Sequence, residues 1–286
     1  MSSRTILVPL DGSAESNAAL PLAHTLAKAT DSSIKLLRAL PGRDQEAARW
    51  AAANLQHIAT ELGGSGIDVS AEVHHGPAGE EILKVLRTDP PAMTVMRTHG
   101  RAGVERAVIG SVTQDVLKHS QIPLVLMRPG QRRPSGIRKL LVPVDGSPGG
   151  AIALSTAVGL AHATSASISL VEVAVPVAMH TICAYEYGGM SYYDSTWDEE
   201  ALAGAAAYVN ALVGRLRERG LTAAGEAVLA PDVAAAIVGK ADRDVVDLVV
   251  MSTHALTGPA RALMGSVADA VVRIAHCPVL LVHRPT

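Results

Sequence analysis

Short apolar runs alternate with stretches of helical periodicity along the whole chain. In the first half, the stretches of strand character are residues 6–10, 34–40, 67–73, 93–96 and 124–127. The stretches with apolar residues at helical spacing are residues 13–30, 45–62, 78–86 and 111–119. Strands that are mostly apolar on both faces and alternate with helices indicate a parallel sheet covered on both sides.

The second half repeats this order of elements. Its stretches of strand character are residues 139–144, 167–174, 223–229, 247–252 and 279–283. Parallel strands joined through helices are connected by right-handed crossovers, which produce a doubly wound layer. The pattern therefore predicts an α/β fold made of two tandem, doubly wound domains with helices on both faces of each sheet.

The chain also repeats two motifs. Residues 5–13 read TILVPLDGS and return at 139–147 as KLLVPVDGS, while the stretch THGRAG…GSV that begins at Thr98 returns as THALTG…GSV from Thr253. Self-similarity on this scale indicates two copies of one domain rather than a solenoid of short units. We assign residues 1–130 to the first domain, the Pro- and Gly-containing polar residues 131–137 to a linker, and residues 138–286 to the second domain.

The second copy contains an insertion. Asp11 and Asp145 are 134 positions apart, whereas Gly110 and Gly265 are 155 apart, so the second copy is 21 residues longer between these motifs. Most of the excess falls in residues 175–198, which hold most of the aromatic residues of the chain. A Tyr- and Gly-rich loop is typical of a lid or a contact surface, and an ordinary surface loop explains it equally well.

Composition restricts the class of protein. The chain of 286 residues is 48% hydrophobic and 18% charged, with a net charge of −2, which is typical of a soluble globular protein and gives no electrostatic reason to expect nucleic-acid binding. No apolar run reaches the roughly 18 residues of a membrane helix, and no signal peptide is recognisable. Cys183 and Cys277 have no metal-site spacing, so we expect a reducing, cytoplasmic setting and no metal centre formed by the protein alone.

The first candidate site motif is the end of the first strand in each copy. Asp11 and Asp145 are placed at the carboxyl end of a parallel strand, where open α/β sheets bind ligands. Gly12 allows a turn, and Ser13 and Ser147 are suited to cap the following helix. Turn and cap chemistry alone would explain the Gly and Ser, but not why the Asp is present in both copies.

The second motif precedes the last helix of each copy. A glycine-containing loop before a helix presents backbone N–H groups to an anion such as phosphate. We predict Ser111 as an N-cap with Gln114 three residues later, and Ser266 as an N-cap with Asp269. A capped helix that binds nothing is the alternative, and the position beside the Asp loop in both copies favours phosphate.

These motifs resemble those of the universal stress protein family over nearly the whole chain. The resemblance implies a five-stranded parallel sheet per domain in the order 3-2-1-4-5, pairing through the last strands of the two halves, and a homodimer as an open alternative. Members that bind ATP use a Gly-x2-Gly-x9-Gly-Ser/Thr loop together with the Asp of the first strand.

Carried over by position, the resemblance implies two sets of nucleotide-binding residues. The first set is Pro9, Asp11, Ala39, Met96, Gly100, Gly110, Ser111, Val112 and Thr113. The second set is Pro143, Asp145, Val173, Met251, Gly265, Ser266 and Val267.

Both copies depart from the family's loop. Arg97 replaces the first glycine in the first copy, and Ser252 and Ala255 replace both leading glycines in the second. A Cβ at these places narrows the site, and Arg97 either blocks the ribose region or turns outward to a phosphate.

Three functions follow as hypotheses. The first is an ATP-binding stress-response or regulatory protein, with ATP bound with or without Mg²⁺ and no dedicated catalytic residues, so that hydrolysis is slow and incidental. The second is a nucleotide-free interaction scaffold of the same fold. The third is an ATP-using enzyme, which the missing Walker-type Gly-Lys-Ser/Thr and the missing Ser-Gly-Gly-x-Asp-Ser loop make the weakest.

Overall fold

A computed structural model describes residues 4–98, 109–132, 134–176, 196–253 and 265–283. The strands of the first half are β1 (Arg4–Pro9), β2 (Ser32–Leu40), β3 (Val69–His75), β4 (Met93–Arg97) and β5 (Leu124–Met127). Those of the second half are β6 (Lys139–Pro143), β7 (Ser167–Ala174), β8 (Ala223–Leu229), β9 (Leu248–Ser252) and β10 (Val279–Val282). The predicted Gly100 and Ala255, and most of the Tyr-rich segment 175–198, lie outside the described residues.

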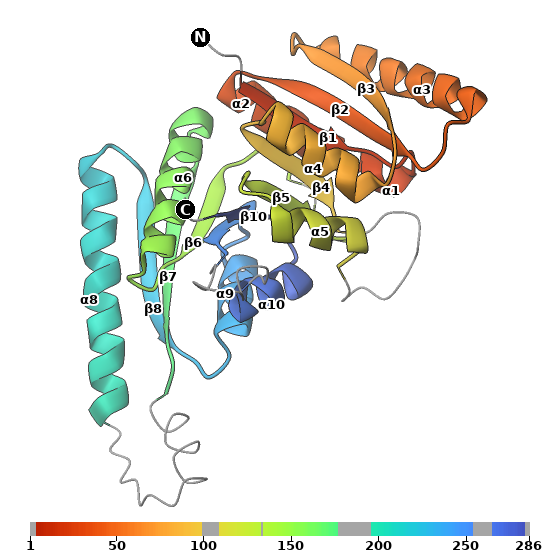
Figure 1. Cartoon of the computed structure of the whole chain (residues 1–286). Helices are drawn as coiled ribbons and strands as arrows, with labels where there is room; N and C mark the ends of the chain where they lie inside the picture. The colour runs from red at the N-terminus through yellow and green to blue at the C-terminus, as the bar shows by residue number, and fades with distance from the viewer. Residues whose placement is uncertain (1–3, 99–108, 133, 177–195, 254–264, 284–286) are drawn as a thin grey trace, which may run out of the picture.

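The ten strands of the described residues form one sheet, in the order β3-β2-β1-β4-β5-β10-β9-β6-β7-β8 (Figure 1). Within each half the strands are parallel and follow the order 3-2-1-4-5, as predicted. The halves meet where β5 pairs with β10 in antiparallel register, so the predicted pairing through the last strands is confirmed within one chain.

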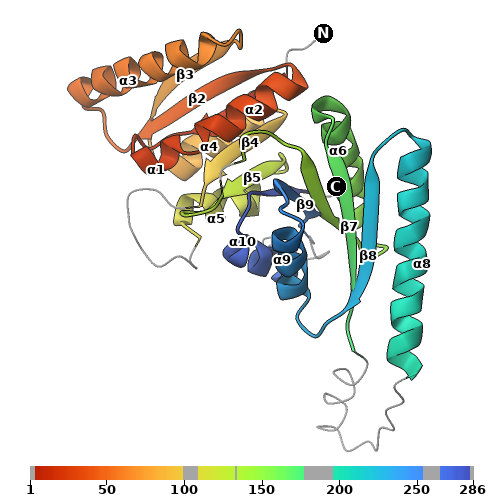
Figure 2. The same cartoon turned by 180° about the vertical axis from the view of Figure 1, so that it is seen from behind.

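Helices cover both faces of this sheet. Those of the first half are α1 (Ala14–Asn17), α2 (Leu20–Thr30), α3 (Gln45–Gly63), α4 (Ala78–Thr88) and α5 (Ser111–His119). Those of the second half are α6 (Pro148–Thr164), α8 (Thr196–Glu218), α9 (Val233–Arg243) and α10 (Ser266–Ile274). Figure 2 shows the sheet from behind, with α3 and β3 at one end and α8 and β8 at the other.

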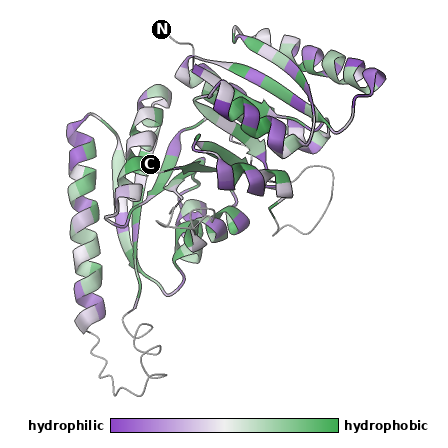
Figure 3. Cartoon of the chain, in the orientation of Figure 1, coloured by the Kyte–Doolittle hydropathy of each residue, from purple (hydrophilic) through white to green (hydrophobic). Residues whose placement is uncertain are grey.

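The buried residues form two layers, one on each face of the sheet. One layer packs under α2, α3, α6 and α8, and the other packs under α4, α5, α9 and α10. The strands are largely hydrophobic and the helices carry polar residues on their outer surfaces (Figure 3). The expected doubly wound α/β fold, with apolar strands between two helical layers, is therefore confirmed.

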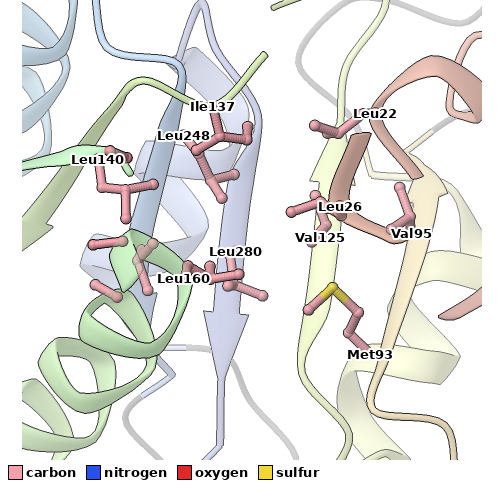
Figure 4. Close-up of a cluster of buried hydrophobic side chains, with 14 of the residues drawn as sticks. Leu22, Leu26, Met93, Val95, Val125, Ile137, Leu140, Leu160, Leu248 and Leu280 are labelled. Carbon is pink, nitrogen blue, oxygen red and sulfur yellow. The ribbon is translucent and has the colours of Figure 1, made fainter. Parts of the chain in front are cut away.

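The junction between the halves is part of this core. Leu280 of β10 pairs with Val125 of β5, and both side chains are fully buried. Leu26 of α2 and Leu160 of α6 belong to the same apolar layer (Figure 4), and α2 and α6 contact each other across the junction. Each half therefore buries part of the other's core.

The predicted linker is bound to the second half. The side-chain amide of Gln131 donates to the carbonyl oxygens of Ala275 and Cys277, each at 2.9 Å, and Gln131 is buried. The backbone N–H of Arg132 donates to the carbonyl oxygen of His276 at 3.0 Å. The first residues of this segment therefore fasten the end of β5 to the loop before β10.

One predicted helix is wrong. Residues 13–30 form two helices, α1 and α2, separated by a turn at Ala18 and Ala19. Pro21 stands in the first turn of α2 and has no N–H for the carbonyl oxygen of Asn17, so a continuous helix cannot form through this point. The equivalent α6 has its proline at the first position, Pro148, and is continuous.

We predict that Leu280→Ala lowers the free energy of unfolding by about 2–5 kcal/mol, because it leaves a cavity at the junction of the halves. Leu229→Ala, at the outer end of β8 where the side chain is 38% exposed, is the matched control, with an expected loss of about 1 kcal/mol or less. Chemical denaturation measures both losses. Equal losses in the two variants would contradict the prediction.

Candidate functional site

The loop after β1 has the turn and cap structure that its sequence predicts. Gly12 has a φ of +81°, and the Ser13 hydroxyl accepts the backbone N–H of Ser16 at 3.0 Å, which caps α1. The carboxylate of Asp11 accepts the backbone N–H of Ser13 at 2.8 Å and its hydroxyl at 2.6 Å. Asp11 therefore holds the turn together in addition to facing the end of the sheet.

The loop after β6 has the same backbone. Gly146 has a φ of +72°, and the Ser147 hydroxyl accepts the backbone N–H of Gly150 at 3.1 Å to cap α6. Asp145 accepts the backbone N–H of Ser147 at 3.0 Å. The side chain of Asp145 is exposed, so it is accessible to a ligand at the carboxyl end of β6.

The N-cap predictions for the last helices are wrong by one residue. Gly110 and Gly265 are the N-caps of α5 and α10, and Ser111 and Ser266 are the first helical residues. The cause is in the backbone, because the carbonyl oxygen of Gly110 already accepts the N–H of Gln114 at 3.0 Å, and that of Gly265 accepts the N–H of Asp269 at 2.9 Å. Neither glycine offers a side-chain oxygen to the first N–H groups of its helix.

A cavity of about 390 Å³ lies at the carboxyl ends of the strands in the second half. Its lining residues are Pro143, Val144, Asp145, Gly150, Val171, Val173, Val233, Ile237, Met251, Ser252, Gly265, Ser266, Val267 and Ala268. All seven residues predicted for this half are among them, so the structure brings them together in one hollow.

Seven of the 14 lining residues are outside the binding set predicted from the sequence. Val233 and Ile237 belong to α9, which carried no motif, and Ala268 follows the predicted helix start. Val171 could have been found from the alternation along β7, because it shares a face of the strand with Val173. The residues of α9 carry no signal beyond their helical spacing.

In the first half, the predicted residues also lie at the carboxyl ends of the strands. Pro9 ends β1, Ala39 lies near the end of β2, and Met96 lies near the end of β4. Val112 lies in the first turn of α5, whose N-cap Gly110 donates its N–H to the carbonyl oxygen of Thr98 at 2.7 Å. This hydrogen bond holds the start of α5 against the end of β4.

The hydroxyl of Thr113 forms a hydrogen bond within the protein. Its side chain is buried, and its hydroxyl donates to the carbonyl oxygen of Arg97 at 3.2 Å. The hydroxyl proton of Thr113 is therefore used within the protein, and its assignment to the nucleotide site stays a prediction. In the second half its counterpart is Ala268, which lines the cavity.

Arg97 points to an acidic residue of its own half. Its guanidinium donates to the carboxylate of Glu15 in α1 at 2.7 Å, and only 4% of the Arg97 side chain is exposed. The guanidinium is thus directed to a carboxylate of the protein, and both alternatives for its role at the nucleotide site stay predictions. The ion pair joins the end of β4 to the first helix, beside the Asp11 turn.

Arg38 of β2 occupies the other side of this turn. A Cβ added to Gly12 would collide with the Arg38 guanidinium, which lies 5.0 Å from the ring centroid of Trp50. Arg38 is 4% exposed, and neither Arg38 nor Glu15 carried a motif in the sequence. The first half therefore surrounds the Asp11 turn with two arginine side chains.

The second half has different residues at the corresponding positions. The strand registers align Arg38 with Glu172 and Arg97 with Ser252, and the repeat aligns Glu15 with Gly149. The exchange of Arg97 for Ser252 is visible in the loop motif itself, and comparing the two copies along these registers would have identified the other two.

Glu172 follows Val171 on the opposite face of β7, outside the cavity lining, and places a second carboxyl group near Asp145. Its Oε2 atom is buried without a hydrogen-bond partner among the described residues. Its pKa is raised, first by burial, which disfavours the ionised form, and second by the nearby Asp145 carboxylate. Two carboxyl groups therefore lie close together at the ends of β6 and β7.

Neither a metal centre nor a membrane span is found in the part of the chain that the structure describes. Within it, no three His, Cys, Asp or Glu side chains are grouped to hold an ion. No described helix combines the length and the apolar character needed to cross a bilayer.

Fold and site together define a tandem pair of doubly wound α/β domains with ligand-sized space at the strand ends. The chain belongs to the universal stress protein family, because the model of that family matches residues 2–128 and again residues 136–283. These matches coincide with the two halves of the sheet.

Individual relatives agree with this assignment. A universal stress protein of Mycolicibacterium smegmatis is 25% identical over 296 residues, covering 97% of this chain and 96% of that protein. One of Methanocaldococcus jannaschii is 51% identical over 49 residues, which are 17% of this chain and only 29% of that protein. The crystal structure of a universal stress protein from Archaeoglobus fulgidus covers 100% of both chains with a TM-score of 0.75 at 18% identity, which supports the fold alone.

We predict that Glu172→Gln flattens the pH dependence of stability. Because the pKa of Glu172 is raised in the folded protein, its stabilising contribution is present at low pH and is lost as the pH rises through the ordinary range of a Glu towards the raised value. At neutral pH the variant should therefore unfold at the same or a higher temperature than the wild type.

Thermal unfolding from about pH 4 to about pH 8 measures this effect. Glu218→Gln, at the exposed end of α8, is the matched control and should follow the wild-type profile. A Glu172→Gln variant with the wild-type profile would show that the pKa of this carboxyl is not raised.

Proposed function

We propose that this protein is a stress-response or regulatory protein that binds ATP in the cavity of its second half. The observation that carries the proposal is that all seven residues expected there from the nucleotide-binding pattern line one cavity of about 390 Å³. A volume of this size falls within the range of small-molecule sites, about 300–1,000 Å³.

The walls of the cavity suit the parts of a nucleotide. Val171, Val173 and Ile237 provide apolar surface for the adenine ring between the ends of β6 and β7 and the α9 helix. Gly265 and Ser266 stand at the start of α10, where backbone N–H groups favour negative charge. The phosphates are therefore expected at the start of α10, and the base against β7 and α9.

The carboxylate in the cavity favours a nucleotide that carries a cation. Asp145 lines the cavity and would repel bare phosphate groups, and no three His, Cys, Asp or Glu side chains of the described residues are grouped to hold a metal ion without the nucleotide. Mg²⁺ is commonly bound by one or two carboxylates together with substrate phosphates. Asp145 fits the role of such a ligand, so we propose that Mg²⁺ enters with ATP.

Binding rather than catalysis is the proposed activity. Among the described residues that line the cavity there is no His, Lys or Cys, and Asp145 is the only ionisable side chain. Efficient acyl or phosphoryl transfer needs a positioned base or a group that stabilises the developing charge. Hydrolysis of bound ATP is therefore expected to be slow and incidental.

Calorimetric titration of the purified protein with ATP tests this proposal. We expect saturable binding in the presence of Mg²⁺ that weakens by about tenfold or more in Gly265→Val, because the added side chain projects at the start of α10. We also expect weaker binding when Mg²⁺ is removed with a chelator.

Gly110→Val is the matched control, because it makes the same change at the N-cap of the equivalent helix α5. Retained ATP binding in this variant places the site in the second half. Absence of saturable binding to the wild-type protein would reject ATP as the ligand and favour the nucleotide-free scaffold.

A further inference from the structure

The two halves have different side chains at one pair of equivalent positions: a long, charged pair in the first half and small residues in the second. In the first half, Glu15 of α1 and Arg97 at the end of β4 meet at 2.7 Å. In the second half their counterparts are Gly149 and Ser252, and a Cβ built on Gly149 would lie 2.6 Å from the Ser252 hydroxyl oxygen. The two positions therefore face each other in both halves, and only the side chains differ.

These positions border the ligand space. Ser252 lines the cavity of the second half, and Gly150, next to Gly149, lines it as well. In the first half the corresponding place holds a buried guanidinium and the carboxylate that pairs with it. In the first half, the long side chains of Glu15 and Arg97 therefore occupy the positions at which the second half has Gly149, without a side chain, and the short hydroxyl side chain of Ser252.

The third exchanged position differs at the neighbouring turn, outside the cavity lining, which contains neither Glu172 nor Gly146. A Cβ on Gly12 would collide with the Arg38 guanidinium, whereas a Cβ on Gly146 would meet nothing within 4 Å. The turn after β1 is therefore covered by Arg38, and the equivalent turn after β6 is open. Glu172, the counterpart of Arg38, does not approach Gly146 in this way.

We propose that the Glu15–Arg97 ion pair closes the nucleotide site of the first half, so that each chain binds one ATP, in the second half. The inference rests on the proposed function and adds which residues decide the number of sites. The first half then acts as a structural partner that completes the sheet through β5.

Buried charge explains why the closure is stable. The Arg97 side chain is 4% exposed, and Glu15, whose side chain is 59% exposed, supplies a negative partner. Removing Glu15 alone takes a carboxylate away from a buried guanidinium, which is unfavourable. The test therefore exchanges both residues together.

Native mass spectrometry of the full chain with ATP and Mg²⁺ counts the bound nucleotides. We expect one ATP per wild-type chain and two per chain of the variant Glu15→Gly/Arg97→Ser, which reproduces the second half at the two positions. One ATP in both proteins would overturn the inference while leaving the proposed function intact. No ATP on the wild type would instead reject the proposed function, and two would show that the first half is open.

The reverse exchange tests the same residues without depending on a new site. Gly149→Glu/Ser252→Arg should abolish binding to the second half, so that no ATP remains bound. The matched control Ser155→Arg/Gly204→Glu adds the same two side chains at exposed positions of α6 and α8 and should retain one ATP. Unchanged binding in Gly149→Glu/Ser252→Arg would overturn the inference, provided that its thermal unfolding shows a folded protein.

Discussion

The antiparallel pairing of β5 with β10 is the interaction on which the rest of the structure depends. It joins two parallel sheets into one, so that neither half exposes an edge at its last strand. Because Leu280 and Val125 face one helical layer while Leu281 and Leu124 face the other, both apolar layers continue through the junction. The side chains of Arg128 and Gln131 also stabilise this junction, because both donate hydrogen bonds to the backbone carbonyl oxygen of Ala275, just before β10.

Two copies of one backbone can support different sites. The Asp-Gly-Ser turns of the halves have the same positive φ at glycine and the same serine cap. What differs is the set of side chains that surround each turn: two arginines and Glu15 in the first half, and Gly149, Glu172 and Ser252 in the second. Such exchanges leave the fold unchanged, because they lie at strand ends and not in the apolar layers between sheet and helices.

The pattern of the sequence predicted the strands, most helices, the doubled domain and the caps at Ser13 and Ser147. It failed where a single residue changes the hydrogen bonding of the backbone. Pro21 lacks the N–H that would continue α1 into α2, and the N-caps of the last helices fall on Gly110 and Gly265 rather than on the following serines. The seven residues expected in the second half do converge on one cavity, whereas the hydroxyl of Thr113 is directed to the carbonyl oxygen of Arg97.

The sequence by itself determined the class of fold, because the spacing of apolar residues is a local property that strands and helices must satisfy one by one. It also determined that the two halves are copies, since near-identical turns recur at fixed offsets. Only the tertiary structure decided where the arginines point. Glu15 and Arg97 are 82 positions apart, and their contact exists because β1 and β4 are neighbours in the sheet and α1 follows β1. A local pattern contains no information about such a contact, which arises from the order of the strands.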